Sequence, residues 1–360
     1  VQACNEVQVN QAIHFGYRGS ATKIIAAGDQ PYINSDCVFC GECVQVCPVG
    51  ALVEKDARYQ VRPWETEKIR TTCTYCGVGC QIYLHVKDGQ VVKISGVDDI
   101  APNFGSLCVK GRFGFSFINH PERLTKPLIK KDGEFVESTW DEALKIVSSK
   151  LGEYRSEELA VLSSAKITNE ENYIVQKFAR AVLGTNNVDH CARLCHAPTV
   201  AGLAQSFGSG AMTNSINEIP QAACLFAIGT NTTSAHPVIA AKMKEAVRNG
   251  AKLIIANPKE IDLCKFANIF LQQIPGTDVP LIMGMARVIL DEGLHDEEFI
   301  KENTENFEAF KESLESYDLN FVEKITGVPA EKIREAARLY AQKKPAGIFF
   351  AMGITQHTHG

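Results

Sequence analysis

The chain has 360 residues, of which 45% are hydrophobic and 22% are charged, and its formal net charge is −5 at pH 7. This length predicts two or three domains rather than a single core. The acidic balance lacks the basic footprint of a nucleic-acid-binding protein, and no run approaches the roughly 18–20 apolar residues of a membrane span.

The first feature in chain order is a dense run of cysteines, Cys37-x2-Cys40-x2-Cys43-x3-Cys47, followed by proline. This is the bacterial ferredoxin motif, in which three cysteines hold one 4Fe-4S cluster and the fourth binds a second cluster. The alternative is that these cysteines bind zinc, but four closely spaced thiolates that end in Cys-Pro fit zinc sites poorly. Thirteen cysteines without an extracellular pattern favour reduced thiols in a reducing compartment, most simply the cytoplasm.

The segment Val1-Gln-Ala-Cys4 is similar to the tail of an earlier copy of the same motif. We therefore expect Cys4 to be the fourth ligand of the cluster held by Cys37, Cys40 and Cys43. Cys47 would then bind a second cluster, whose other ligands would lie upstream of the first residue. The sequence thus predicts a partial two-cluster ferredoxin-like domain over residues 1–60, in a chain that begins inside a motif.

A second cysteine set follows, Cys73-x2-Cys76-x3-Cys80 and then Cys108. Three thiolates from one loop and a fourth from a separate turn can complete a 4Fe-4S site, although zinc remains an alternative for this set. Between them, alternating residues 81–86 and 91–95 flank Asp88-Gly and predict a hairpin that brings Cys108 back to the loop. We expect a small β-rich 4Fe-4S domain over residues 66–122.

From about residue 138 the pattern changes to alternating helices and strands. Thr139 with Glu142, and Thr168 with Glu171, predict two capped helices, and residues 159–163 predict a strand between them. The apolar runs 223–229 and 252–256 predict buried strands on either side of a helix that begins at His236-Pro and ends at Asn249-Gly. This strand–helix–strand unit favours a parallel, doubly wound α/β sheet.

The remaining segments continue the α/β pattern. We expect a strand at 269–272, a polar loop and N-cap at 275–278 before a helix at 280–290, short covering helices over 294–344, and a strand at 346–352. Together, residues 123–360 predict incomplete α/β domains, with a nucleotide-binding-like subdomain at 217–344. In such sheets ligands lie beyond the carboxyl ends of the strands. No G-x-G-x-x-G motif follows a strand, so a standard NAD site is not supported.

The segment from Asp189 to Leu203 holds a cysteine beside a histidine, Cys195-His196. A thiolate next to an imidazole provides a soft metal ligand and a group that can shuttle protons. The alternative is a buried structural cysteine with a hydrogen-bonded histidine. We expect the unassigned cysteines to be small core residues, and they are Cys191, Cys224 and Cys264.

The motifs Cys73-Thr-Tyr-Cys-Gly-Val-Gly-Cys80, Cys108-Val-Lys-Gly-Arg112 and Cys-Ala-Arg-Leu-Cys195-His196 occur in this order. In this combination the chain resembles the catalytic subunit of formate dehydrogenases, members of the molybdopterin oxidoreductase family. The preceding ferredoxin-like module resembles the N-terminal arms of members that are coupled to NAD, ferredoxin or hydrogenase subunits.

This resemblance implies a bis(molybdopterin guanine dinucleotide) cofactor with molybdenum or tungsten. It also implies that Cys195 binds the metal, that His196 is the histidine beside it, and that Lys110 lies between the cluster and a pterin. The residues implied to contact one guanine dinucleotide are Gly229, Asn231, Ser234, His236, Asn257, Lys259, Gly276 and Asp278. Many relatives have Asp-Pro-Arg where this chain has Asn257-Pro-Lys259, so the guanosine contacts are expected to differ.

The implied activity is the reversible oxidation of formate to carbon dioxide. Electrons would leave one at a time through the cluster of the second cysteine set to the ferredoxin-like module, and then to a partner subunit. In the family, an arginine that holds formate and a C-terminal barrel follow the segment where this chain stops, so the piece alone is expected to lack a complete active site. The alternatives are a nitrate reductase or other molybdopterin oxidoreductase, a non-catalytic iron-sulfur relay resembling the large subunit of respiratory complex I, and a zinc-bound interaction module.

Overall fold

The structure is a computed structural model that describes residues 1–58, 61–358 and 360. His357 and His359 could suggest a metal site, but two histidines so close to the end of the chain are more often incidental, and His359 lies outside the described residues. The chain forms two compact units, the first built from Val1–Phe115 and Ala211–Gly360 and the second from Ser116–Gly210. Among the described residues, none of the helices combines the length and the apolar character that crossing a bilayer requires.

The helices and strands have the following bounds. The strands are β1 (Ile13–Gly16), β2 (Lys23–Ala26), β3 (Glu67–Thr72), β4 (Gln81–Lys87), β5 (Gln90–Gly96), β6 (Leu128–Lys131), β7 (Glu134–Glu137), β8 (Val161–Ser163), β9 (Val188–His190), β10 (Cys224–Ile228), β11 (Lys252–Ala256), β12 (Ile269–Leu271) and β13 (Ala346–Phe350). The α-helices are α1 (Glu42–Gln45), α2 (Val109–Phe113), α3 (Trp140–Leu151), α4 (Asn169–Ala181), α5 (Ala197–Phe207), α6 (Thr232–Ala235), α7 (Pro237–Arg248), α8 (Asp278–Asp291), α9 (Glu297–Asn303), α10 (Phe307–Ser313), α11 (Leu319–Thr326), α12 (Ala330–Gln342) and α13 (Met352–Thr355).

The main sheet of the first unit is parallel, with strand order β12-β11-β10-β13. All five residues of β10 are buried, as expected for a central strand covered on both faces. The buried run 223–229 and the strand 252–256 are therefore correct predictions, and the helix between them begins at Pro237 as its sequence indicates. The α/β fold class predicted from the alternating elements is confirmed.

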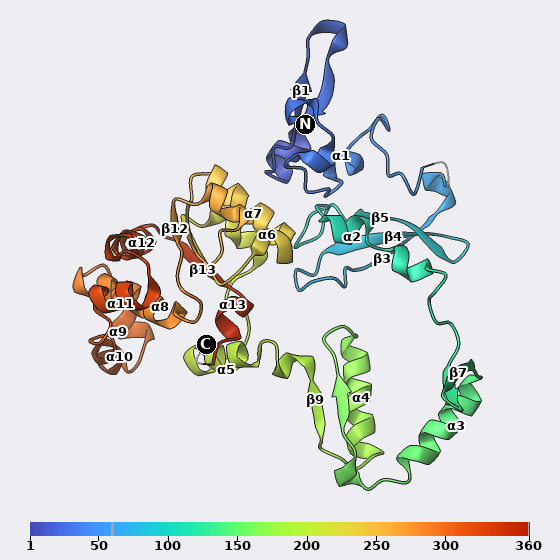
Figure 1. Cartoon of the computed structure of the whole chain (residues 1–360). Helices are drawn as coiled ribbons and strands as arrows, with labels where there is room; N and C mark the ends of the chain where they lie inside the picture. Colours follow the sequence, from blue (N-terminus) through green and yellow to red (C-terminus); the bar gives the residue numbers. More distant parts are fainter. Residues whose placement is uncertain (59–60, 359) are drawn as a thin grey trace. The chain divides into compact units, whose positions relative to one another are not determined.

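Each face of this sheet has its own core, because side chains alternate along a strand. Phe226 and Ile228 of β10 pack with Leu281 of α8 and Ile333 of α12. The opposite face of the same strand packs with Met243 of α7. Helices thus cover both faces, with α7 on one side and α8, α11 and α12 on the other (Figure 1). This is the doubly wound arrangement.

Two antiparallel sheets carry the cysteine-rich part of the first unit. β1 pairs with β2, and β3, β4 and β5 form a meander. Asp88 and Gly89, between β4 and β5, have φ values of 52° and 75°. Positive φ at both central residues is typical of a type I′ turn, so the hairpin predicted at Asp88-Gly89 is confirmed.

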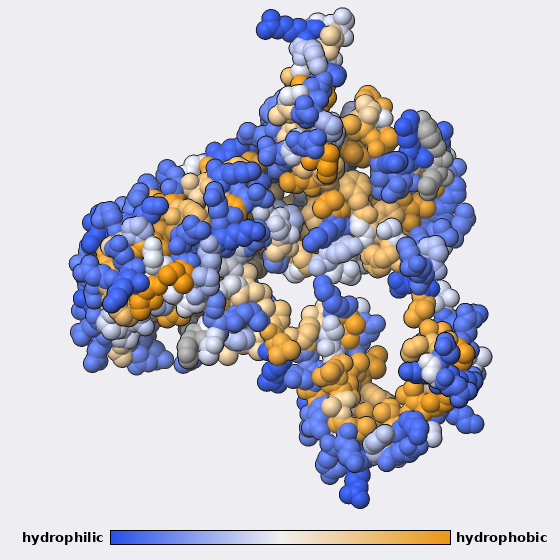
Figure 2. Space-filling view, in the orientation of Figure 1, coloured by the Kyte–Doolittle hydropathy of each residue, from blue (hydrophilic) through white to orange (hydrophobic). Residues whose placement is uncertain are grey.

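The second unit contains α3, α4, α5 and the short parallel pair β8 and β9. Thr139 and Thr168 accept hydrogen bonds from the backbone N–H groups of Glu142 and Glu171, so both predicted N-caps are confirmed. Apolar side chains of α3 and α4 are exposed within this unit, among them Trp140, and Figure 2 shows apolar residues gathered over these helices.

Two local expectations need correction. The helix α8 begins at Asp278, and its N-cap is Thr277, which makes no side-chain capping bond. The helices between residues 294 and 344, which the sequence predicts as a solvated covering layer, also contribute to the core, because Val322 of α11 and Ile333 of α12 are fully buried against the sheet. The domain boundaries expected at 1–60, 66–122, 123–360 and 217–344 stay a prediction.

Candidate functional site

The N-terminal cysteines gather around Cys4, which is buried in the π-helical turn Ala3–Val7. Cys37 and Cys43 pack against it, and the Cys4 sulfur accepts a hydrogen bond from the N–H of Ala12 at 3.3 Å. Burial raises the pKa of the Cys43 thiol, and the nearby charges of Cys37 and Cys4 add to the rise. The structure therefore places Cys4 beside the first cysteine run, although its binding of iron stays a prediction.

Cys40 and Cys47 differ in their surroundings. Burial raises the pKa of the Cys40 thiol to about 11. The pKa of Cys47 is lowered instead, because the N–H of Leu52, with those of Val49, Ala51 and Gly50, points at its sulfur. Such a nest of backbone N–H groups favours an anion. A Cys47 thiolate is therefore stabilised by its own loop.

The second cysteine set also comes together in the first unit. Cys73 and Cys76 pack against buried Cys80, and the N–H of Cys73 donates to the carbonyl of Cys80 at 2.8 Å. Burial raises the pKa of Cys80 to about 12, with further contributions from Cys73, Cys76 and Cys108. Cys108 directly precedes α2, and the hairpin of β4 and β5 separates it in sequence from the loop of Cys73, Cys76 and Cys80. The fold brings Cys108 back beside that loop, close enough to affect the pKa of Cys80.

The raised thiol pKa values of Cys40 and Cys43 in one set, and of Cys80 in the other, fit sites for the cationic core of an iron-sulfur cluster. Buried thiols with raised pKa values ionise readily only beside a compensating positive charge, which bound iron supplies. Across residues 1–58, 61–358 and 360, no three cysteine, histidine, aspartate or glutamate side chains are arranged to hold one metal ion. Thiolates that each bind a different iron of a 4Fe-4S cluster need not converge on a single point.

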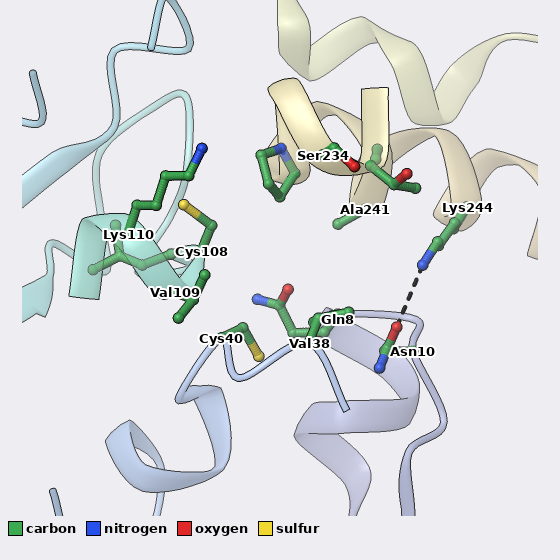
Figure 3. Close-up of a pocket in the computed structure, with 14 residues that line it drawn as sticks. Gln8, Asn10, Val38, Cys40, Cys108, Val109, Lys110, Ser234, Ala241 and Lys244 are labelled. Atoms are coloured by element: carbon green, nitrogen blue, oxygen red, sulfur yellow. Dashed lines mark hydrogen bonds between the residues drawn. The ribbon is translucent and has the colours of Figure 1, made fainter. Parts of the chain in front are cut away.

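A cavity of about 190 Å³ lies where three parts of the first unit meet. The N-terminal module contributes Cys40, the start of α2 contributes Cys108 and Lys110, and the helices after β10 contribute Ser234 and Lys244 (Figure 3). One cysteine from each predicted cluster, the predicted bridging lysine and a predicted dinucleotide contact thus line the same cavity. Lys244 also donates to the side chain of Asn10 at 3.4 Å.

The predicted dinucleotide residues cluster at the carboxyl edge of the parallel sheet. Gly229 follows β10, and Asn231 and His236 flank the short helix α6. In the sheet, β11 lies on one side of β10 and β13 lies on the other side. The direction in which successive strands are added therefore reverses between β10 and β13. Ligands of doubly wound sheets bind at such a reversal. Here the N–H of Gly353, after β13, donates to the carbonyl of Gly229 at 3.0 Å.

The loops after β11 and β12 hold the other predicted contacts. The Asn257 side chain donates to the carbonyl of Thr230 at 3.2 Å and accepts from the N–H of Lys259 at 3.0 Å. Asn257 therefore ties its own loop to the loop after β10. Gly276 has a φ of 84° and precedes Asp278 in the loop after β12.

Asp278 has two partners in the folded first unit. Its Oδ1 accepts from Gln273 at 2.8 Å, and its Oδ2 lies 3.3 Å from Nε2 of His357. The side chain of Asp278 is buried. The proximity of Asp278 and His357 brings the start of α8 next to the segment after β13.

Cys195 and His196 belong to the second unit and lie between a short 3-10 turn, Cys191–Arg193, and α5. Both are half-buried, and Nδ1 of His196 lies 3.3 Å from the Thr199 hydroxyl. Cys191 is exposed and accepts from the N–H of Ala165 at 3.1 Å. The prediction that Cys191 is a core residue is therefore wrong, because its turn is held at the surface by hydrogen bonds, whereas Cys224 is fully buried as expected.

Sequence reasoning missed a buried polar network beneath Cys40. Arg112, inside the quoted Cys-Val-Lys-Gly-Arg motif, forms an ion pair with Glu42 at 3.3 Å, and both side chains are almost fully buried. Gln8 also donates to Glu42 at 3.4 Å. Two signals in the sequence could have indicated it. Arg112 lies four residues after the predicted cluster ligand Cys108, and Glu42 lies between the predicted ligands Cys40 and Cys43.

Three family models match the chain. The molybdopterin oxidoreductase model matches residues 123–360, the molybdopterin oxidoreductase Fe4S4 domain matches 66–120, and the 4Fe-4S binding domain matches 31–53. The chain therefore carries domains for iron-sulfur clusters and for a molybdopterin cofactor.

Several relatives are similar over most of the chain. It is 48% identical to the F420-dependent formate dehydrogenase 2 subunit alpha of Methanococcus maripaludis and 49% identical to the F420-dependent formate dehydrogenase subunit alpha of Methanocaldococcus jannaschii, each over 82% of this chain. The chain spans 44% of the length of each of these relatives.

A solved structure, the acetylene hydratase from Pelobacter acetylenicus, matches 80% of this chain and 40% of its own, with a TM-score of 0.70 and 29% identity. The family match covers most of the sequence, and the cysteine sets and the doubly wound sheet agree with it. By this evidence, the chain belongs to the molybdopterin oxidoreductase family.

Proposed function

We propose that this chain is part of the catalytic subunit of a formate dehydrogenase, which oxidises formate reversibly to carbon dioxide and passes the electrons on singly. The observation that carries the proposal is the meeting of Cys40, Cys108 and Lys110 at one cavity. Two cysteine sets that share a cavity wall suit a relay rather than two independent structural sites. The relatives that are named formate dehydrogenases support the choice of substrate.

The fold alone does not determine the reaction, because one fold hosts many chemistries. The acetylene hydratase shares the fold at 29% identity, whereas the relatives named formate dehydrogenases reach 48% and 49%. The local pair Cys195-His196 also favours formate over nitrate as the substrate. Formate oxidation is therefore the function that the observations support best.

When bound, a bis(molybdopterin guanine dinucleotide) centre with molybdenum or tungsten supplies a two-electron acceptor, and 4Fe-4S clusters supply one-electron acceptors. In this proposal Cys195 binds the metal and His196 takes up or releases a proton beside it. The Thr199 hydroxyl, 3.3 Å from Nδ1 of His196, would orient the imidazole. Lys110 supplies a positive charge at the cavity that Cys108 also lines.

The loops at the carboxyl edge of the sheet would hold one guanine dinucleotide. Gly229, Asn231, Ser234 and His236 would contribute from the loop and helices after β10. Asn257 and Lys259 would contribute from the loop after β11, Gly276 from the loop after β12, and Asp278 from the start of α8. The order reversal at β10 and β13 supports this placement.

The cysteine ligands divide into two clusters in this proposal. Cys73, Cys76, Cys80 and Cys108 would hold the first, and Cys4, Cys37, Cys40 and Cys43 the second. Cys47 would bind a further cluster, as the crossed ferredoxin pattern indicates. Electron-transfer subunits linked to NAD, ferredoxin or hydrogenase would accept the electrons in the cytoplasm.

The test is formate-dependent reduction of a dye by the intact protein, compared with nitrate reduction by the same preparation. Cys195→Ser should abolish formate oxidation, because a serine hydroxyl is a poor substitute for a soft thiolate ligand. Cys191→Ser is the matched control, four residues earlier in the same segment, and should keep the activity. Activity in Cys195→Ser equal to that of the control would remove Cys195 as the metal ligand. An intact protein that contains iron but neither molybdenum nor tungsten, and that does not oxidise formate, would remove the catalytic proposal and favour the relay subunit.

A further inference from the structure

Arg112 connects the two cysteine sets through a continuous series of bonds. It lies one helical turn after Cys108, and its N–H donates to the carbonyl of Cys108 at 3.0 Å. Its Nε donates to the carbonyl of Cys40 at 2.7 Å, although the two residues are 72 positions apart in sequence. Covalent bonds and two hydrogen bonds therefore lead from one predicted cluster ligand to the other.

The guanidinium group makes further bonds to the same segment of the N-terminal module. One terminal nitrogen donates to Oε1 of Gln45, and the other lies 3.3 Å from Oε2 of Glu42. Gln45 in turn accepts from the N–H of Gly96 at 3.0 Å and donates to Asp98 at 2.9 Å. A buried charge is tolerated only when it is paired and hydrogen-bonded, and this network meets both conditions.

The backbone beside Cys40 is shaped for this contact. Gly41 has a φ of +72°, and a Cβ atom there would lie 2.2 Å from Cδ of Arg112 and 2.7 Å from Cζ of Phe113. No side chain fits at that distance, so glycine allows both the turn and the close approach. The position of Arg112 is therefore specified from both sides of the contact.

We infer that Arg112 is a positioning residue for electron transfer between the two clusters. Arg112 holds the loop of Cys40 against α2, the helix that follows Cys108. It thereby fixes the separation of the two cysteine sets at the cavity that Cys40 and Cys108 both line (Figure 3). With both clusters bound, one electron at a time would pass from the cluster at Cys108, which would be oxidised, to the cluster at Cys40, which would be reduced; no bond would break and no proton would move. This inference rests on the proposed relay.

The experiment uses the intact protein with its clusters, prepared without oxygen. Iron content and the electron paramagnetic resonance signals of the reduced clusters are measured first in the wild type, in Arg112→Lys and in Arg112→Gln. Lysine keeps the charge for Glu42 but lacks the guanidinium fork, and glutamine removes both. Arg70→Gln is the control, because Arg70 is exposed on β3 of the same domain.

Two readouts separate positioning from mere stabilisation. We expect the magnetic interaction between the two reduced clusters to change in both Arg112 variants. Rapid-freeze measurements should show the signal of the cluster at Cys40 appearing about tenfold more slowly, because small displacements of a reacting pair have large effects on rate. Gly41→Ala should reproduce both changes from the other side of the contact, and Arg70→Gln should show neither.

The outcomes are distinguishable. Two intact clusters with unchanged interaction and unchanged rate in Arg112→Lys would overturn the inference while leaving the proposed function in place. If Arg112→Gln loses a cluster, Arg112→Lys decides the question by the same two readouts. A wild-type protein without two cluster signals would instead overturn the proposed relay itself.

Discussion

Replacing Gly229 by alanine tests whether the loops after β10 and β13 meet at the edge of the parallel sheet. Gly229 has a φ of +58°, and a Cβ atom there would lie 2.8 Å from the carbonyl carbon of Gly353 and 2.9 Å from the nitrogen of Ile354. Alanine in the left-handed region costs roughly 1–2 kcal/mol. Forcing a methyl group against the backbone adds about 1–3 kcal/mol, because the neighbouring atoms have to move.

Gly293→Ala is the matched control, because Gly293 has a φ of +63° and no atom within 4 Å of the added Cβ. It should lose only the conformational part, roughly 1–2 kcal/mol. Gly353→Ala approaches the same contact from the other side, where its Cβ would lie 2.4 Å from the carbonyl oxygen of Gly229. We therefore expect Gly229→Ala to be the most destabilised of the three variants.

The assay is guanidinium denaturation of each variant, monitored by circular dichroism. The denaturation midpoints are compared among variants that have the same dependence of the unfolding free energy on denaturant concentration. Equal losses in Gly229→Ala and Gly293→Ala would refute the reasoning, because the contact between the two loops would then contribute nothing. A Gly353→Ala variant as stable as the wild type would count against it in the same way.

Three further outcomes are expected. Burial raises the pKa of Glu54 to about 7, so the folded protein keeps a proton that the unfolded chain releases near 4.5, and stability falls as the pH rises through that interval. In urea denaturation, Glu54→Gln should remove this pH dependence of the unfolding free energy, which is on the order of 1–2 kcal/mol after allowance for solvent screening. An unchanged pH dependence would contradict the assignment to Glu54. Burial lowers the pKa of His85 to about 4, and its Nε2 lies 2.8 Å from the Ser95 hydroxyl. Stability should therefore fall as the pH falls from 6.5 toward 4, and His85→Gln should lose that pH dependence in the same urea assay. A variant that keeps the dependence would show that another group is responsible. Arg248 donates to the carbonyls of Asn5 at 3.2 Å and Glu6 at 2.9 Å, so Arg248→Gln should speed hydrogen exchange in the turn that carries Cys4, with exchange at wild-type rates as the contradicting result.

Sequence patterns predicted the elements whose signals are local. The hairpin at Asp88-Gly89 follows from two residues that accept positive φ, and the N-cap at Thr168 follows from a threonine three positions before a glutamate. The strand at 252–256 was predicted to the residue, because its continuous apolar run ends in a polar loop. The position of Cys4 beside Cys37 and Cys43 was also expected, since a ferredoxin motif repeats its own spacing.

Contacts between distant segments could not be predicted in the same way. Arg112 and Cys40 meet only after the β3–β5 meander and the N-terminal module have folded against each other, and no periodicity in the sequence encodes that meeting. The contact of His357 with Asp278 likewise depends on β13 returning beside β10. The exposure of Cys191 was not predicted, because a free cysteine is most often a small core residue. In the structure its sulfur lies at the surface and accepts a hydrogen bond from the N–H of Ala165.

The most direct test of the central claim is electron paramagnetic resonance of the reduced intact protein, with iron and acid-labile sulfide measured on the same sample. At least two distinct 4Fe-4S signals are expected in the wild type, one for each of the two complete cysteine sets. Cys108→Ser should alter or remove one of them and Cys40→Ser the other, because the two cysteines belong to different sets. A colourless protein with stoichiometric zinc, or a single signal altered in the same way by both substitutions, would contradict the assignment of two clusters in series.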